Sequence, residues 1–154
     1  MAVAGKKKIL LVDDTATVRI LERAILGTDY DYAEGKNGAE GVELCHSYVP
    51  DLILMDLNMP VCDGVSALAQ LKMDTKTRSI PVVIVTSEGD AAKKARCLAL
   101  GCTDFLAKPI DGALLKAVEA NHRALQQLVD QGANLRETHV KKALDEIERV
   151  EDMF

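Results

Sequence analysis

The sequence predicts an α/β protein with a doubly wound, five-stranded parallel sheet and a C-terminal helical extension. Three long apolar runs, at 8–12, 52–55 and 80–85, are bounded by turn residues, which is typical of strands buried on both faces. Strand-like and helix-like segments alternate five times with short connections. That alternation favours a parallel sheet with helices on both of its faces.

Two shorter runs complete the predicted sheet. Residues 30–34 are less apolar than the other runs, as expected of an edge strand. Residues 103–107 form the last predicted strand, which ends at Lys108-Pro109.

Helix boundaries follow from capping residues. Thr15, Asn37, Asp63 and Asp111 each stand just before a helical pattern, where a side-chain oxygen can accept a hydrogen bond from the first turn. Gly27 and Gly101 end the first and fourth helices, and Pro50 breaks the chain after the second. Apolar stripes are predicted at Val18, Leu21 and Ile25, at Ala39, Val42, Cys45 and Val49, at Val65, Leu68 and Leu71, and at Leu114, Val118, Leu125 and Leu128.

Composition narrows the class of protein. The 154 residues are 48% hydrophobic and 28% charged, as in a soluble globular domain. The net charge of −5 argues against nucleic-acid binding. No apolar run approaches the roughly 20 residues that span a bilayer, and the short apolar block at 9–12 is not expected to act as a signal peptide. A protein without membrane insertion is therefore expected. The four cysteines lack metal-binding spacing, which favours reduced thiols, so the expected location is cytoplasmic.

Polar residues follow four of the five predicted strands: Asp13 and Asp14, then Asp56, Thr86 and Lys108. Neighbouring parallel strands lie about 4.8 Å apart, so these side chains are expected to converge at one edge of the sheet. Three carboxylates about 4 Å apart repel one another by several kcal/mol, so a cation is expected to offset them. An open, all-oxygen site suits Mg²⁺.

Asp56 is the candidate nucleophile of this site, because Asp63 is better placed to cap the following helix. A carboxylate beside Mg²⁺ can attack phosphorus and form an aspartyl-phosphate. Lys108 adds a positive charge for the phosphoryl group, and Thr86 adds a hydroxyl donor. Taken singly, Thr86 as a cap, Lys108 as a surface residue and the aspartates as turn residues are ordinary structural roles.

Five motifs resemble the receiver domain of two-component response regulators, the CheY-like family. They are Val12-Asp13-Asp14, Met55-Asp56-Leu57-Asn58-Met59-Pro60, Asp63-Gly64, Val85-Thr86-Ser87 and Phe105-Leu106-Ala107-Lys108-Pro109. The resemblance runs from about residue 7 to 128 and implies the family's strand order 2-1-3-4-5. It also implies a cis peptide at Lys108-Pro109.

The resemblance implies a role for each matching residue. Asp56 accepts a phosphoryl group from a histidine kinase or a histidine phosphotransfer protein. Mg²⁺ (or Mn²⁺) is held by Asp14, Asp56 and the backbone carbonyl of Asn58, with Asp13 acting through water. Lys108 and Thr86 hold the phosphoryl oxygens.

The remaining implied roles concern switching and the lifetime of the phosphoryl group. Thr86 and Phe105 move inward and change the surface of the fourth helix, last strand and fifth helix, which binds a downstream protein target or output domain. Asn58 and Glu88 tune hydrolysis and indicate a short-lived phosphoryl group. Cys62 and Cys102 depart from the family pattern, and Cys62 is expected near the mouth of the site.

Two other functions remain as alternatives. A haloacid-dehalogenase-type phosphatase also forms an aspartyl-phosphate, but it wants an Asp two residues after the nucleophile, where this chain has Asn58. A phosphorylation-inert dimerisation module would bind no Mg²⁺. The expected function is a switch rather than an enzyme, with phosphorylation and autodephosphorylation of Asp56 as its only chemistry.

The C-terminal extension is predicted as a second unit, so that residues 1–130 form the receiver and residues 131–154 a helix. Asn134 and Glu137 resemble a capping box, and Val140, Ile147 and Phe154 recur at heptad spacing. A helix of this length needs a surface to cover, because its ion pairs alone contribute too little. A homodimer through this helix is the favoured arrangement. Packing on its own receiver, packing on an output domain and a frayed, solvated tail are the alternatives.

Overall fold

The computed structural model describes residues 5–87 and 91–130, with side chains described as far as residue 123. Five parallel strands form one sheet in the order β2-β1-β3-β4-β5, which confirms the expected topology. The strands are β1 (Lys7–Val12), β2 (Tyr30–Gly35), β3 (Leu52–Asp56), β4 (Val82–Ser87) and β5 (Asp104–Lys108). The helices are α1 (Ala16–Leu26), α2 (Gly38–Ser47), α3 (Gly64–Met73), α4 (Ala91–Leu100) and α5 (Gly112–Asp130).

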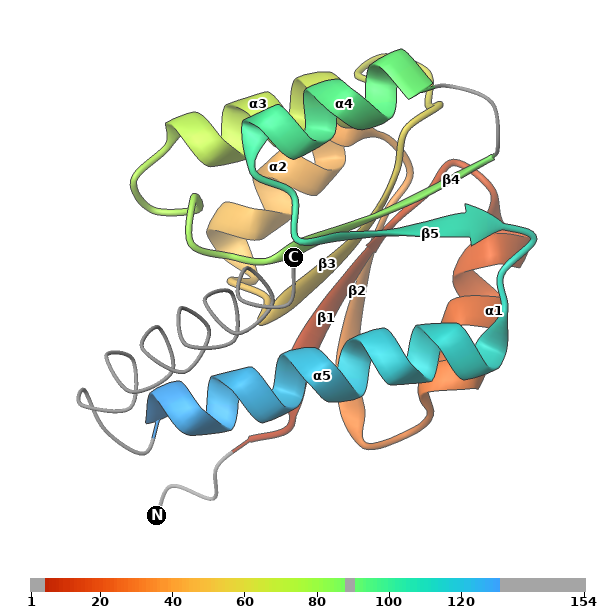
Figure 1. The fold of residues 1–154 in the computed structure, drawn as a ribbon, viewed down its shortest axis with the longest axis vertical. Coiled ribbons are helices and arrows are strands. Elements are labelled where there is room, and N and C mark those ends of the chain that lie inside the picture. The colour runs from red at the N-terminus through yellow and green to blue at the C-terminus, as the bar shows by residue number, and fades with distance from the viewer. Residues whose placement is uncertain (1–4, 88–90, 131–154) are drawn as a thin grey trace, which may run out of the picture. The chain divides into compact units, whose positions relative to one another are not determined.

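Helices cover both faces of the sheet. Figure 1 shows α2, α3 and α4 on one side and α1 on the other. The start of α5 lies beside α1, because a Cβ on Gly112 would lie 3.6 Å from a side-chain carbon of Ile25. Residues up to Lys116 form one compact unit, and residues from Ala117 on belong to a second. None of the helices in the described part of the chain is long and apolar enough to cross a membrane.

The alternation of side chains along each strand divides the core between the two faces. Leu10, Ile53 and Ile84 point to one face, where they pack with the buried residues of α3. The intervening residues, such as Leu11 and Leu54, are also fully buried and point to the face that α1 covers. Because both faces are covered, the central strands are apolar throughout, as the sequence predicted.

Most of the predicted helix boundaries are confirmed. Side-chain oxygens of Asn37, Asp63 and Asp111 accept hydrogen bonds from the first turns of α2, α3 and α5, at 2.9, 2.8 and 2.9 Å. Gly27 and Gly101 end their helices at positive φ, 90° and 97°, a conformation that glycine adopts without strain.

Four expectations about helices were wrong. Thr15 precedes α1, but its side chain makes no capping hydrogen bond. The buried residues of α1 are Arg19 and Glu22 rather than Leu21, which is 43% exposed. The rotation of the helix about its axis is fixed by Arg19, which donates to Glu34 and to the backbone carbonyl of Asp13.

The other two differences concern residues at helix ends. Val49 lies beyond the end of α2 and is 59% exposed. In α5, Leu115 is buried and Leu114 is exposed, so the apolar face begins one residue later than predicted. The predicted helix at 131–154 lies outside the described residues, and the predicted boundary between residues 130 and 131 stays a prediction.

Candidate functional site

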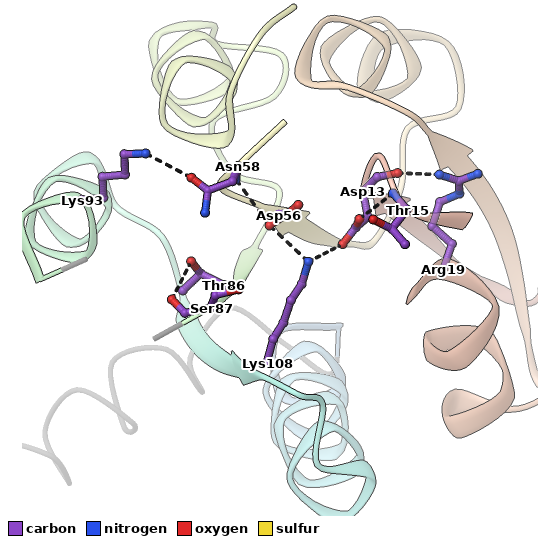
Figure 2. A network of polar contacts seen from close by, with 9 residues as sticks. All are labelled: Asp13, Thr15, Arg19, Asp56, Asn58, Thr86, Ser87, Lys93 and Lys108. Carbon is purple, nitrogen blue, oxygen red and sulfur yellow. Dashed lines mark hydrogen bonds and ion pairs between the residues drawn. The ribbon is translucent and has the colours of Figure 1, made fainter. Parts of the chain in front are cut away.

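Strand register brings three charged side chains to one edge of the sheet. Val12 is aligned with Met55, so Asp13 and Asp56 are neighbours one residue further along β1 and β3. Lys108 ends β5 at the same edge. Its ammonium lies 2.9 Å from Oδ2 of Asp13 and 3.4 Å from Oδ1 of Asp56 (Figure 2). The structure therefore assembles the predicted cluster from strands that are far apart in the sequence.

The carboxylates of Asp13, Asp14 and Asp56 each place an oxygen within 4.8 Å of the others. Asp13 and Asp56 are buried, whereas Asp14 is exposed and opens the cluster to solvent. Hard oxygen ligands with one solvent-facing side are the donor set that Mg²⁺ prefers, because this ion keeps several of its waters. The residues present therefore fit a divalent cation at this position.

The cluster carries more negative charge than Lys108 neutralises. Burial raises the pKa of Asp56, the nearby charge of Asp13 raises it further, and Lys108 only partly opposes both effects. Burial by itself would lower the pKa of Lys108, but its hydrogen bond to Asp13 and the charge of Asp56 outweigh burial and raise that pKa. The ammonium is therefore firmly charged, and the remaining carboxylate charge favours binding of a further cation.

Asp13 is held in place from several sides. Its Oδ1 accepts a hydrogen bond from the backbone N–H of Thr15 at 2.8 Å. Arg19, which is buried, donates from Nη1 to the backbone carbonyl of Asp13, and its Nε lies 3.0 Å from Oε1 of Glu34. Sequence reasoning missed this role of Arg19, because Arg19 lies on α1 and its partner Glu34 lies on β2, and no local sequence pattern links the two.

Glu22 is a second residue that sequence reasoning missed. It lies on α1 with its side chain only 2% exposed, and its Oε1 has no hydrogen-bond partner among the described residues. Burial raises the pKa of Glu22 to about 8, and the charges of Asp13 and Asp56 add to that rise while Lys108 opposes it. A carboxyl group with this pKa is largely protonated at neutral pH.

Asn58 connects the acidic cluster to α4. Its backbone N–H donates to Oδ1 of Asp56 at 3.4 Å, and its side-chain Oδ1 accepts a hydrogen bond from Nζ of Lys93 at 3.1 Å (Figure 2). Lys93 lies in the first turn of α4. Nothing in the local sequence identified Lys93, since its contact depends on how α4 packs. Glu88, the other residue expected to tune hydrolysis, lies outside the described residues.

Thr86 and Phe105 project from neighbouring strands on one face of the sheet. Thr86 is aligned with Ala107, and Phe105 is aligned with Ile84, so the two side chains are diagonal neighbours. Thr86 is 1% exposed, and its hydroxyl donates to the carbonyl of Ser87 at 3.2 Å. This arrangement places a hydroxyl next to an aromatic ring that is only partly buried.

Two further expectations concern Lys108-Pro109 and Cys62. The Lys108-Pro109 peptide is cis, as expected. Cys62 is directed toward the start of α2, since its sulfur would lie 2.9 Å from a Cβ placed on Gly38. The four thiols are unpaired, and three of them are buried.

Comparison with known proteins agrees with this geometry. Residues 9–119 match the model of the response regulator receiver domain family. The chain is 37% identical to Protein PilH of Pseudomonas aeruginosa over 115 residues, which cover 73% of this chain and 95% of PilH. It is 38% identical to Response regulator PleD of Caulobacter vibrioides over 111 residues, which cover 71% of this chain but only 24% of PleD.

Among solved structures, the Mn²⁺-bound form of response regulator Rcp1 superposes with a TM-score of 0.67 at 26% identity, covering 74% of this chain and 92% of that one. The fold and the acidic edge of the sheet define a receiver-type signalling domain. This chain belongs to the response regulator receiver family of two-component signal transduction.

Proposed function

We propose that Asp56 accepts a phosphoryl group from a phosphohistidine of a histidine kinase or a histidine phosphotransfer protein. One observation carries the proposal: the buried carboxylate of Asp56 lies at the end of β3, 3.4 Å from the ammonium of Lys108 and within 4.8 Å of oxygens of two further carboxylates. In the transfer, an Asp56 oxygen bonds to phosphorus as the phosphorus–nitrogen bond breaks, and the histidine leaves with its nitrogen electron pair.

The divalent cation in this proposal is Mg²⁺ or Mn²⁺. Asp14, Asp56 and the backbone carbonyl of Asn58 would hold it, with Asp13 acting through water. When bound, the ion would offset the negative charge that the carboxylates and the phosphoryl group share. The proximity of the three carboxylates supports this assignment, as does the Mn²⁺-bound form of response regulator Rcp1, which has a similar fold.

Lys108 is proposed to bind a phosphoryl oxygen. It is paired with Asp13 at 2.9 Å, so a short side-chain movement would bring its ammonium from a carboxylate to the phosphoryl group. The hydroxyl of Thr86 would bind another phosphoryl oxygen by giving up its bond to the Ser87 carbonyl.

The switch in this proposal is a coupled movement of Thr86 and Phe105. Because the two side chains are diagonal neighbours, a shift of Thr86 toward the phosphoryl group would leave room for the ring of Phe105 to turn inward. Phosphorylation would thereby change the surface of α4 and β5, which a downstream protein target or output domain would bind. The homodimer through residues 131–154 is a separate proposal, and light scattering with and without those residues tests it.

Phosphorylation is tested with Mg²⁺ and acetyl phosphate as a small donor. Mass spectrometry should show one added phosphoryl group on the wild type and none on Asp56→Asn, because an amide is a poor nucleophile toward phosphorus. Asp29→Asn is the matched control, since Asp29 is exposed and lies away from β3. Persistent labelling of Asp56→Asn would show that another residue is the acceptor.

Coupling is tested in the same samples. Thr86→Ala should still be phosphorylated but should leave Phe105 in its starting environment, as seen by ¹⁹F NMR of a fluorinated phenylalanine. Equal spectral changes in wild type and variant would contradict the proposed coupling. Negligible hydrolysis of p-nitrophenyl phosphate is expected as well, because the amide of Asn58 cannot act as a general acid.

A further inference from the structure

We propose that Lys93 is a positioning residue that orients the side-chain amide of Asn58 and so lengthens the lifetime of the phosphoryl group on Asp56. The proposal rests on the function proposed above, namely phosphorylation of Asp56. It concerns a residue of α4, on the opposite side of Asp56 from Lys108 (Figure 2).

The contact between Lys93 and Asn58 has only one chemically allowed form. Nζ of Lys93 lies 3.1 Å from Oδ1 of Asn58. An ammonium carries three donors and no acceptor, so it can bind the amide oxygen but not the amide nitrogen. Lys93 therefore fixes which end of the amide faces α4, and Figure 2 shows the Nδ2 group of Asn58 turned away from Lys93, toward the side where Thr86 lies.

Asn58 is close enough to the acceptor for this orientation to matter. Its backbone N–H already donates to Oδ1 of Asp56 at 3.4 Å, which ties the β3–α3 loop to the reacting carboxylate. Asn58 is exposed, so its side chain is on the solvent side of the buried Asp56. Water must approach the phosphorus from that side.

Hydrolysis of the aspartyl-phosphate requires water to attack phosphorus opposite to the Asp56 oxygen. The new oxygen–phosphorus bond forms as the old one breaks, Asp56 leaves as a carboxylate, and the water proton passes to the released phosphate or to solvent. An amide oxygen facing the site would accept a hydrogen bond from that water and align it. An Nδ2 group facing the site donates to phosphoryl oxygens instead, which holds the group in place and offers the water no acceptor.

The charge on α4 is directed toward the same loop. The pKa of Asp63 is lowered mainly by hydrogen bonds from the backbone and side chain of Ser66, against the opposing effect of burial, and to a smaller extent by the charges of Lys93 and Arg96. Lys93 and Arg96 of α4 therefore lie near the β3–α3 loop. This attraction helps to keep Lys93 beside Asn58.

The test measures decay of the phosphoryl group after the donor is removed. Proteins are labelled with ³²P-acetyl phosphate and Mg²⁺, desalted rapidly and followed over time. Lys93→Met keeps the aliphatic stem but removes the donor, and should decay about three- to tenfold faster than wild type, the range expected for loss of one orienting hydrogen bond. Lys93→Arg keeps a donor-only side chain and should decay at close to the wild-type rate.

Two controls separate positioning from a general effect of charge or folding. Lys94→Met removes the same charge from the adjacent position of α4 and should leave decay unchanged. In an Asn58→Ala background, Lys93→Met should have no further effect, because there is no amide to orient. The side-chain amide ¹H and ¹⁵N chemical shifts of Asn58, followed by NMR without any phosphorylation, should change in Lys93→Met, because the hydrogen bond to Oδ1 is lost, and should stay close to wild type in Lys94→Met.

Several outcomes overturn the proposal. Equal decay of Lys93→Met and wild type, or an acceleration that persists in the Asn58→Ala background, would exclude positioning through Asn58. Labelling of Asp56 with unchanged decay would leave the proposed function intact and reject only the role of Lys93. Failure of the wild type to accept a phosphoryl group would reject both.

Discussion

The ammonium of Lys108 lies 2.9 Å from Oδ2 of Asp13, a residue that precedes it by 95 positions in the sequence. The pair joins the last strand of the sheet to the end of the first. Asp13 is only 2% exposed, and its carboxylate is held by this partner and by the N–H of Thr15. Lys108 thus has a structural role before any phosphoryl group is present.

Removal of that cation should destabilise the metal-free protein. Lys108→Met leaves Asp13 and Asp56 buried without their ammonium, which should cost about 2–4 kcal/mol in the free energy of unfolding. Urea denaturation in buffer with a chelator measures the loss, and Lys116→Met, at an exposed position, is the control. Millimolar Mg²⁺ should restore part of the lost stability if the cluster binds the ion. An unchanged midpoint in chelator would show that the pair contributes nothing.

Asp14 offers a separate test of metal binding. Because Asp14 is exposed while Asp13 is bonded to Lys108 and Thr15, Asp14→Asn should change metal-free stability by less than about 0.5 kcal/mol. The same substitution removes a charged oxygen ligand and should weaken Mg²⁺ binding about tenfold or more. Isothermal titration calorimetry with Mg²⁺ compares the two proteins. Equal affinity would exclude Asp14 as a ligand.

Glu22 should make stability fall with pH. Burial raises its pKa from 4.5 to about 8, so between these values the unfolded chain has lost the proton that the folded protein still holds. Deprotonation then favours the unfolded state, and the free energy of unfolding decreases as pH rises from about 4.5 to about 8.

Glu22→Gln removes this titration and should flatten the profile. Relative to wild type, the variant should gain stability progressively across that window, by about 1–3 kcal/mol at its upper end. Denaturation midpoints at a series of pH values measure the difference, with Glu43→Gln at an exposed position as control. Parallel profiles for wild type and Glu22→Gln would mean that Glu22 ionises normally.

Arg19 and Arg23 share Glu34 but differ in burial. Each lies 3.0 Å from a different oxygen of that carboxylate, with side chains 9% and 51% exposed. Arg19→Met also leaves the backbone carbonyl of Asp13 without its donor and should cost about 2–4 kcal/mol. Arg23→Met breaks an exposed pair and should cost less than about 1 kcal/mol. Similar losses for both variants, measured by urea denaturation, would show that burial does not set the contribution.

Gly64 is required for space rather than for backbone conformation. A Cβ at this position would overlap the backbone carbonyl oxygen of Asp56, which cannot move without displacing β3. Gly64→Ala should therefore lower stability by more than about 2 kcal/mol and reduce phosphorylation as well. Gly112→Ala is the matched control, because its nearest neighbour would lie at 3.6 Å, an ordinary contact. It should be neutral or slightly stabilising, since alanine favours helix. Thermal denaturation of both variants tests the contrast.

Local patterns in the sequence determined much of the fold. The apolar runs gave the strands because a strand covered on both faces must be apolar throughout. Asn37, Asp63 and Asp111 gave helix starts because capping is a contact between residues three or fewer positions apart. The charged residues of the acidic edge were predictable for the same reason, since every parallel strand ends at a common edge.

Only the tertiary structure decided which side chains from different elements contact one another around the acidic edge. The rotation of α1 is set by partners of Arg19 on other elements, so the helix buries Arg19 and Glu22 where the sequence favoured Leu21. The contact of Lys93 with Asn58 joins residues 35 positions apart and depends on how α4 packs. Such contacts carry no periodic signal, because their energy depends on distance and burial in the folded chain rather than on sequence spacing.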